Sequence, residues 1–270
     1  MGRFNYYDNI AEIYDESRWI DDAIASDVSN FILKLVQAKP DTNFLEPGIG
    51  TGLNIFPFVQ QGYTVTGIDI SAEMLGQLRR KAGDQASNLT LIQGDASPLP
   101  FPNCSFDVVL TVHMSHGVSD LKTFGAEIHR VLKPGGFYLC PQWLIPTARL
   151  KFENQFRAIA ANYTQKIEAS RQSKRIDCDI ELSQYLLERG YQEHYFNVKE
   201  WEVKNSVGEL LKNFQSRAYG FCWRVEDAVF GQVMDKFHTF CVENYGSLAT
   251  ELSSQAKYEL WSYQKPPHGN

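Results

Sequence analysis

The stretch Phe44-Leu45-Glu46-Pro47-Gly48-Ile49-Gly50-Thr51-Gly52 decides the fold class. It begins as a short apolar run, turns through glycines at alternate positions, and leads into a segment that we expect to be helical. Glycine leaves the backbone bare, so a ligand can approach the main chain closely. The N-terminus of a following helix offers N–H groups to a carboxylate. The stretch therefore predicts a strand, a ligand-binding turn and a helix.

The same alternation continues from residue 43 to residue 143. Segments with helical period separate short apolar runs that are bounded by Gly or Pro. These runs are Asn43 to Glu46, Thr64 to Asp69, Leu89 to Gln93, Phe106 to Val112 and Phe137 to Cys140. Such a pattern is typical of a doubly wound, mostly parallel α/β sheet.

Helix signals support this fold class. Ser71 is placed to cap a helix that carries Met74, Leu75 and Leu78 on one face. The segment Leu121 to Leu132 has the same period, and it ends at Lys133-Pro134-Gly135-Gly136, where proline cannot continue a helix.

The pattern changes after Trp143. We expect a long helical insertion from Thr147 to Ser173, a further helix from Leu182 to Arg189, and helical segments between Gly208 and Asn244. The segments His194 to Val203 and Tyr258 to Tyr263 are predicted to pair as antiparallel strands at the sheet edge. We interpret residues 1–270 as one domain, with a core at 40–143, a cap at 144–190 plus 1–30, and C-terminal strands and helices at 191–265.

Composition excludes several classes of function. A net charge of −6 offers no broad positive field for nucleic acid. The chain has neither a charged, apolar leader nor an apolar run of about 18 residues, so we expect a soluble, cytoplasmic protein without a membrane span. Its 5 cysteines are scattered and never form a C-x-x-C pair, which argues for reduced thiols and against a zinc site.

The ligand is predicted to contain a nucleoside. Asp69 ends the strand after the glycine loop, where a carboxylate can accept hydrogen bonds from both ribose hydroxyls. An NAD-linked oxidoreductase is the main competitor, since a glycine loop followed by an acid is also its fingerprint. The spacing disfavours NAD, because a G-x-G-x-x-G loop would need glycine at Leu53, and because Glu46 is unexpected beside a pyrophosphate.

Glu46 to Gly52 resembles the E-x-G-x-G-x-G motif of class I S-adenosylmethionine-dependent methyltransferases, in particular the type 11 small-molecule group. Further matches follow in register over residues 4 to 143. They are Asp69 as the ribose ligand, Gly94-Asp95-Ala96, Phe106-Asp107-Val108-Val109, His116 to Asp120, and Val131 to Gly136. The resemblance implies a seven-stranded Rossmann-like sheet, a helical insertion after its fifth strand, S-adenosylmethionine as cofactor, and S-adenosylhomocysteine as product.

An N-terminal match, Tyr7 to Arg18, resembles the segment that covers the cofactor in this family. The resemblance places Tyr14 near the methionine part and Arg18 near its carboxylate; the alternative is a surface helix that packs Ile10, Ile13 and Tyr14 on the core. The complete set of cofactor-binding residues that we predict is Tyr14, Arg18, Glu46, Gly48, Gly50, Asp69, Ile70, Met74, Asp95, Ala96, Thr111 and His116.

The reaction itself leaves a weaker signal. Methyl transfer from a sulfonium is an in-line displacement that needs positioning and a dry pocket and no covalent residue. His113 follows the fourth strand at the ligand-binding edge and is our candidate general base, whereas His116 is interpreted as a loop-positioning residue. The acceptor is expected to be a small molecule. A non-catalytic S-adenosylmethionine-binding protein stays open as a third hypothesis.

Two features beyond the core bear on the acceptor. The segment Thr147 to Ser173 has apolar residues (Leu150, Phe152, Phe156, Ile159, Ile167) beside bases, which suits either a substrate lid with a wet outer face or a helix that props the sheet edge. Its bases, Arg149 to Arg175, are interpreted as a solvated face. Six aromatic residues are candidates for a pocket or for core: Tyr6, Trp19, Trp143, Tyr163, Phe221 and Trp223.

Overall fold

A computed structural model describes residues 6–83, 87–114, 118, 120–168 and 177–267. The strands are β1 (Asn43–Pro47), β2 (Thr64–Asp69), β3 (Leu89–Gln93), β4 (Phe106–Leu110), β5 (Leu132–Leu144), β6 (Gln192–Ser206) and β7 (Glu251–Gln264). The helices are α1 (Tyr6–Ile10), η1 (Ala11–Ile13), α2 (Asp22–Leu35), α3 (Phe56–Gln60), α4 (Ala72–Ala82), α5 (Leu121–Val131), α6 (Thr147–Ala160), α7 (Asp177–Leu187), α8 (Val207–Gln215), η4 (Gly220–Arg224) and α9 (Asp227–Tyr245).

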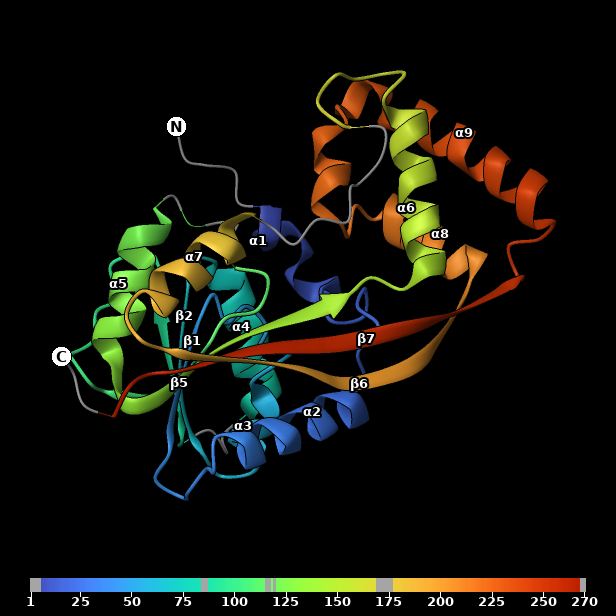
Figure 1. Ribbon diagram of the computed structural model, residues 1–270. Helices are drawn as coiled ribbons and strands as arrows, with labels where there is room; N and C mark the ends of the chain where they lie inside the picture. The colour runs from blue at the N-terminus through green and yellow to red at the C-terminus, as the bar shows by residue number, and fades with distance from the viewer. Residues whose placement is uncertain (1–5, 84–86, 115–117, 119, 169–176, 268–270) are drawn as a thin grey trace. The chain divides into compact units, whose positions relative to one another are not determined.

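The strands form one seven-stranded sheet in the order β3-β2-β1-β4-β5-β7-β6 (Figure 1). The pairs β1 with β2, β1 with β4, β2 with β3, and β4 with β5 are parallel. The remaining strands contribute an antiparallel hairpin, as the sequence predicts. The doubly wound, mostly parallel α/β fold is therefore confirmed, including the helix α6 that follows the fifth strand.

The chain divides into two compact units. The first, called here the sheet unit, contains residues Ile20–Gln142, Lys174–Lys199 and Tyr258–Asn270. The second, called the helical unit, contains Met1–Trp19, Trp143–Ser173 and Glu200–Lys257. Residues 144–190, which are predicted to form a cap, are thus shared between the sheet unit and the helical unit.

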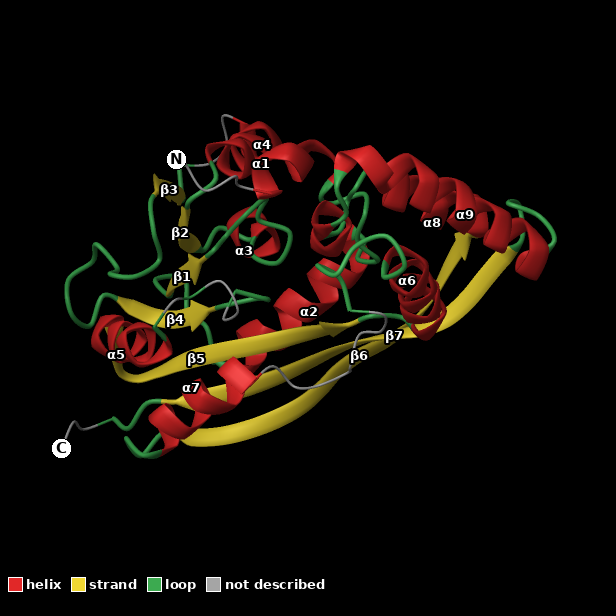
Figure 2. Cartoon of the chain, turned by 90° about the horizontal axis from the view of Figure 1, so that it is seen from above, coloured by secondary structure: helices red, strands yellow, loops and turns green. Residues whose placement is uncertain are grey.

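Helices cover both faces of the parallel strands in the sheet unit. The helices α2, α3 and α4 lie on one face, and α5 and α7 lie on the other (Figure 2). Strand residues such as Leu45, Val109 and Tyr138 are at most 1% exposed, and they pack against Phe124 and Ile128 of α5 in one apolar cluster. This core holds the strand ends, and hence the loops that follow them, in fixed positions.

Local sequence signals explain where these elements begin and end. The Ser71 hydroxyl accepts a hydrogen bond from the Met74 N–H at 3.1 Å and so caps α4, as predicted. Asp120 caps α5 by accepting hydrogen bonds from the N–H groups of Lys122 and Thr123. The predicted turn at Lys133 to Gly136 is an irregularity inside β5, where the pairing with β4 shifts and Gly135 has a φ of 77°.

The helical unit has its own core. Phe152 and Phe156 of α6 are 0% exposed and pack with Phe214 of α8 and Phe237 of α9. The ring centroids of Phe152 and Phe237 are 4.7 Å apart, and those of Phe156 and Phe214 are 5.1 Å apart. Phe221 belongs to the same cluster, so this predicted aromatic residue is core.

Two expectations for the segment Thr147 to Ser173 need correction. The helix ends at Ala160, where turns begin, and residues 169–173 lie outside the described part. The pattern predicts solvated basic side chains, yet Arg149 and Arg157 are 8% and 9% exposed. Arg157 is buried because it pairs with Glu153 at 2.9 Å and lies over the Phe221 ring, and Arg149 is buried because it lies over the ring of Tyr219.

The N-terminal segment belongs to the helical unit and packs within it. The Tyr6 hydroxyl donates to the Ala218 carbonyl at 2.9 Å, and the Trp201 indole donates to the Trp19 carbonyl at 3.1 Å. Ile13 packs against the cluster of α6, α8 and α9. Within the described residues, no helix is both long enough and apolar enough to cross a membrane.

Candidate cofactor site

The candidate site lies at the carboxyl ends of β3, β2, β1 and β4, which are neighbours in the sheet unit. The glycine loop after β1 is fixed by the N–H groups of Gly48 and Ile49, which both donate to the Ile68 carbonyl of β2. Gly48, Gly50 and Gly52 have φ values of 73°, 55° and 73°, a region that favours glycine. The predicted sharp turn is therefore present.

The glycines in this loop serve different purposes. A Cβ on Gly48 would lie 2.6 Å from Met114, and one on Gly52 would lie 2.5 Å from Leu78, so these positions need glycine for packing. A Cβ on Gly50 would meet no described atom within 4 Å. The main chain at Gly50 consequently faces open space, as close approach of a ligand requires.

Asp69 sits at the centre of this edge. One carboxylate oxygen accepts the Gly50 N–H at 2.8 Å, and the other accepts the Ser71 N–H at 2.9 Å. A carboxylate oxygen has two lone pairs and can accept more than one hydrogen bond. Asp69 thus links the glycine loop to the start of α4, and its predicted contact with a ribose stays a prediction.

Glu46 lies in β1, two residues before Gly48, and is 1% exposed. Its side chain makes a hydrogen bond with Asn54, but no described residue provides a hydrogen bond to its Oε2. Burial and the nearby Asp69 carboxylate raise the pKa of Glu46 well above its usual range. A buried tyrosine of β7, Tyr258, interacts electrostatically with Glu46.

The ends of β3 and β4 complete the edge. Asp95 is exposed and accepts the Ser97 N–H at 3.1 Å. Thr111 is buried and shares a hydrogen bond of 2.6 Å with the Tyr138 hydroxyl. His113 is exposed and has a φ of 52°, which is uncommon for a residue other than glycine. His116 lies outside the described residues.

Three further predicted residues differ in accessibility. Ile70 follows Asp69 and is 62% exposed, an unusual position for a large apolar side chain. Ala96 follows β3 and is partly exposed. Met74, a residue of α4, is 2% exposed and belongs to the core. Of these three, Ile70 is the most available to a ligand.

Tyr14 and Arg18 belong to the helical unit, so their predicted contact with the cofactor stays a prediction. The Arg18 guanidinium lies 4.0 Å from the centroid of the Tyr14 ring, and it donates to the Ser17 hydroxyl at 2.9 Å. None of the ion pairs formed between described residues involves Arg18. Its guanidinium instead interacts with the rings and hydroxyls of neighbouring tyrosines, Tyr14 among them.

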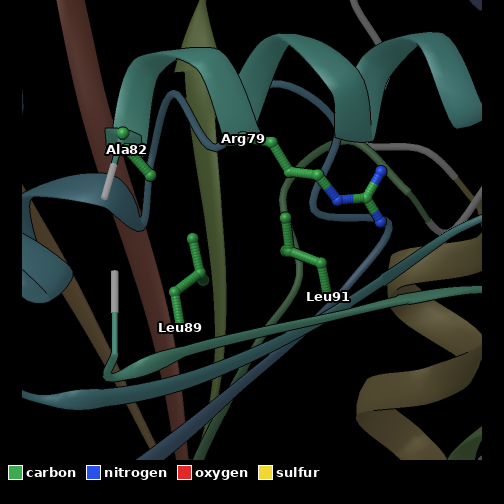
Figure 3. A pocket seen from close by; sticks show the side chains of 5 residues that line it. Arg79, Ala82, Leu89 and Leu91 are labelled. Atoms are coloured by element: carbon green, nitrogen blue, oxygen red, sulfur yellow. The ribbon is translucent and has the colours of Figure 1, made fainter. Parts of the chain in front are cut away.

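Two hollows in the sheet unit lie away from this edge. One of about 180 Å³ lies between the end of α4 and β3, with Arg79 and Ala82 above Leu89 and Leu91 (Figure 3). The other, of about 300 Å³, lies at the amino ends of β1 and β4, beside Lys133 to Phe137. Neither contains a predicted site residue. Within the described ranges, no group of three metal-ligating side chains comes together.

Comparisons with known proteins identify the family. A family model described as "Methyltransferase domain" matches residues 45–140, the span of the glycine loop and the parallel strands. The demethylmenaquinone methyltransferase of Tropheryma whipplei is 30% identical over 190 residues, which cover 69% of this chain and 72% of that protein. The chain belongs to the class I S-adenosylmethionine-dependent methyltransferases.

Two other similar proteins have different named activities. The fatty-acid O-methyltransferase of Mycolicibacterium smegmatis is 37% identical over 92 residues, which cover 34% of this chain and 33% of that protein. The solved structure of the [4+2]-cyclase SpnF has a TM-score of 0.57 at 15% identity, covering 97% of this chain and 95% of that chain. The methyltransferase membership argues against the NAD-linked hypothesis, while the cyclase shows that fold alone does not fix the reaction.

The residues at the strand ends fit S-adenosylmethionine. Asp69 places a carboxylate against the glycine loop, Gly50 faces open space, and Glu46 offers a buried oxygen without a hydrogen-bond partner among the described residues. Sequence reasoning missed Asn54, which makes a hydrogen bond with Glu46 from the loop after β1, and also Tyr258 and Met114, which interact with Glu46 and Gly48 from distant segments. No sequence motif marks these three residues, and the contacts of Tyr258 and Met114 arise only when the strands assemble.

Proposed function

We propose that this methyltransferase transfers the sulfonium methyl group of S-adenosylmethionine to a small, apolar acceptor by in-line displacement. The observation that carries the cofactor assignment is the position of the Asp69 carboxylate, which ends β2 and accepts the N–H groups of Gly50 in the glycine loop and of Ser71 at the start of α4. The acceptor class rests on the names of two relatives, a demethylmenaquinone methyltransferase and a fatty-acid O-methyltransferase, whose named acceptors are both largely apolar.

Different residues of the sheet unit are assigned to different parts of the cofactor. Asp69 would hold the ribose, the open main chain at Gly50 would face the ligand, and the exposed Ile70 and Asp95 would contact the adenine. When bound, the cofactor supplies an electrophilic methyl carbon on a positively charged sulfur. The protein then has to orient the acceptor and exclude water.

His113 is the proposed general base. Its left-handed backbone conformation costs about 1 to 2 kcal/mol for a residue with a Cβ. Such conformations cluster at functional sites, and here the strained residue lies three positions after Leu110, the last residue of β4. An exposed imidazole at this place takes the proton that an acceptor hydroxyl or amine loses as its lone pair attacks the methyl carbon.

The test is to incubate the purified protein with S-adenosylmethionine labelled in its methyl group and a metabolite extract. The expected result is label in an extractable, apolar product together with stoichiometric S-adenosylhomocysteine. The variant Asp69→Ala serves as the control and should form little of either product. Calorimetric binding of S-adenosylmethionine without any labelled product would favour the non-catalytic hypothesis, and binding of NAD alone would refute the proposal.

A further inference from the structure

Glu46 is an acidic residue in an environment that destabilises a negative charge. Its side chain is 1% exposed, and one of its carboxyl oxygens has no hydrogen-bond partner among the described residues. An ionised carboxylate that loses water needs a cation or several N–H donors to compensate, and otherwise it takes up a proton.

The groups that face Glu46 supply no such compensation. Asn54, in the loop after β1, contributes a neutral hydrogen bond. Asp69 of β2 adds a second carboxylate, and Tyr258 of β7 adds a buried phenol whose own charged form is disfavoured, with Cys140 of β5 beside it. The two titratable groups that act on Glu46, Asp69 and Tyr258, are therefore both acids.

The two carboxyl groups are not equivalent. Asp69 accepts the N–H groups of Gly50 and Ser71, and such bonds stabilise its ionised form. Glu46 has the single amide partner and is more deeply buried. When the pair holds one proton, that proton therefore resides on Glu46.

We propose that Glu46 carries a proton in the ligand-free protein and releases it when a cationic group of the cofactor lies beside it. Cofactor binding and proton release are then one coupled event. The inference rests on the proposed function, because S-adenosylmethionine provides the cation through its ammonium or its sulfonium. It makes Glu46 a specificity-determining residue, since a neutral nucleoside cannot replace the proton.

The pH dependence follows from the sign of this exchange. Below the pKa of Glu46 in the free protein, the ligand must expel a proton, so affinity falls as the pH is lowered. The limiting slope is about tenfold in affinity per pH unit, and it disappears above that pKa. The proton goes to the buffer, and no covalent bond other than O–H changes.

The experiment is isothermal titration calorimetry of the full chain in two buffers of different ionisation enthalpy, repeated from mildly acidic to mildly alkaline pH. S-adenosylmethionine should release about one proton per site at the acidic end and progressively less as the pH rises. Because 5′-methylthioadenosine lacks both cationic groups, it should bind without proton release. S-adenosylhomocysteine keeps only the ammonium, so its proton count identifies which cation acts.

Two variants make the test specific. Glu46→Gln should bind S-adenosylmethionine more weakly, without proton release and with little pH dependence. Asp41→Asn removes an exposed carboxyl at the opposite, amino edge of the sheet and should leave the proton count unchanged. Circular dichroism checks that Glu46→Gln is folded. If it is not folded, the proton release measured with the unmodified chain in the two buffers still tests the proposal.

The possible results distinguish a failure of the role proposed for Glu46 from a failure of the proposed function. Tight binding of S-adenosylmethionine without proton release, or equal release by 5′-methylthioadenosine or by Glu46→Gln, overturns the role of Glu46 and leaves the proposed function standing. Absence of any binding of S-adenosylmethionine defeats the proposed function itself, and this inference with it.

Discussion

Replacement of Asp69 by alanine tests the core of the site assignment. The carboxylate accepts the N–H groups of Gly50 and Ser71 at 2.8 Å and 2.9 Å and is proposed to accept two ribose hydroxyls as well. A hydrogen bond to a charged group contributes about 1.5 to 3 kcal/mol when buried, and Asp69 is only partly buried. We therefore expect a loss of about 2 to 3 kcal/mol for the two hydroxyls together.

This loss corresponds to about a 30- to 160-fold higher Kd for S-adenosylmethionine, measured by calorimetry. The fold should survive with a cost of about 1 to 2 kcal/mol in the free energy of unfolding, because water can reach the released N–H groups of Gly50 and Ser71. Urea unfolding measures that cost. Asp69→Asn keeps one acceptor oxygen and should show an intermediate Kd.

Asp41→Ala provides the matched control, since Asp41 is an exposed carboxylate at the opposite, amino edge of the sheet. It should change neither quantity. An unchanged Kd for Asp69→Ala would place the ribose elsewhere and refute the assignment. A loss of stability without a loss of affinity would mean that Asp69 stabilises the glycine loop and does not bind the ribose.

Three further predictions concern packing and charge. Gly52→Ala should destabilise the protein by about 1 to 3 kcal/mol in urea unfolding, because its Cβ would lie 2.5 Å from a leucine methyl of α4. Glu153→Gln should cost about 3 kcal/mol by the same assay, since it leaves the buried Arg157 cation without its carboxylate partner; a cost below about 1 kcal/mol would mean that water or another group compensates. Because burial raises the pKa of Cys222, its thiol stays protonated at neutral pH, so a thiol reagent followed by peptide mass spectrometry should modify the exposed Cys104 and spare Cys222.

The parallel strands were predictable because their signals are local. Each of the first four is a short apolar run between Gly, Pro or polar residues, and β2 and β3 begin and end where the sequence predicts. The cap at Ser71 was predictable for the same reason, since a hydroxyl three residues before Met74 is a local arrangement. Strand lengths were less predictable, because β5 extends from Leu132 to Leu144 through a proline and two glycines that suggested a turn.

Contacts between distant segments could not be predicted. The apolar period of α6 shows which face is buried but not what covers it, and the covering residues come from α8, η4 and α9. For the same reason Arg149 and Arg157 looked solvated, although the rings of Tyr219 and Phe221 cover their guanidinium groups. Glu46 was predictable from the motif, whereas its neighbour Tyr258 lies more than 200 residues away in the chain.

The burial of α6 leads to a prediction about its dynamics. A mobile lid would have few buried apolar contacts and would belong to the least stable part of the molecule. In contrast, Phe152, Phe156 and Ala160 are 0% exposed within the helical unit. Amide hydrogens in the second half of α6 should therefore exchange only when the helical unit opens as a whole, with the same protection in the free protein as those of α9.

Phe156→Ala tests the physical cause of that protection. Removing a fully buried phenylalanine costs about 3 to 5 kcal/mol, so exchange throughout α6 and α9 should accelerate together in this variant. Lys151→Ala, an exposed position on the same helix, should leave the exchange rates nearly unchanged. Rapid exchange of α6 in the native free protein, with protection gained only when S-adenosylhomocysteine and an acceptor are added, would show instead that the helix is a lid. In that case the apolar contacts of Phe152 and Phe156 would contribute much less than their burial implies.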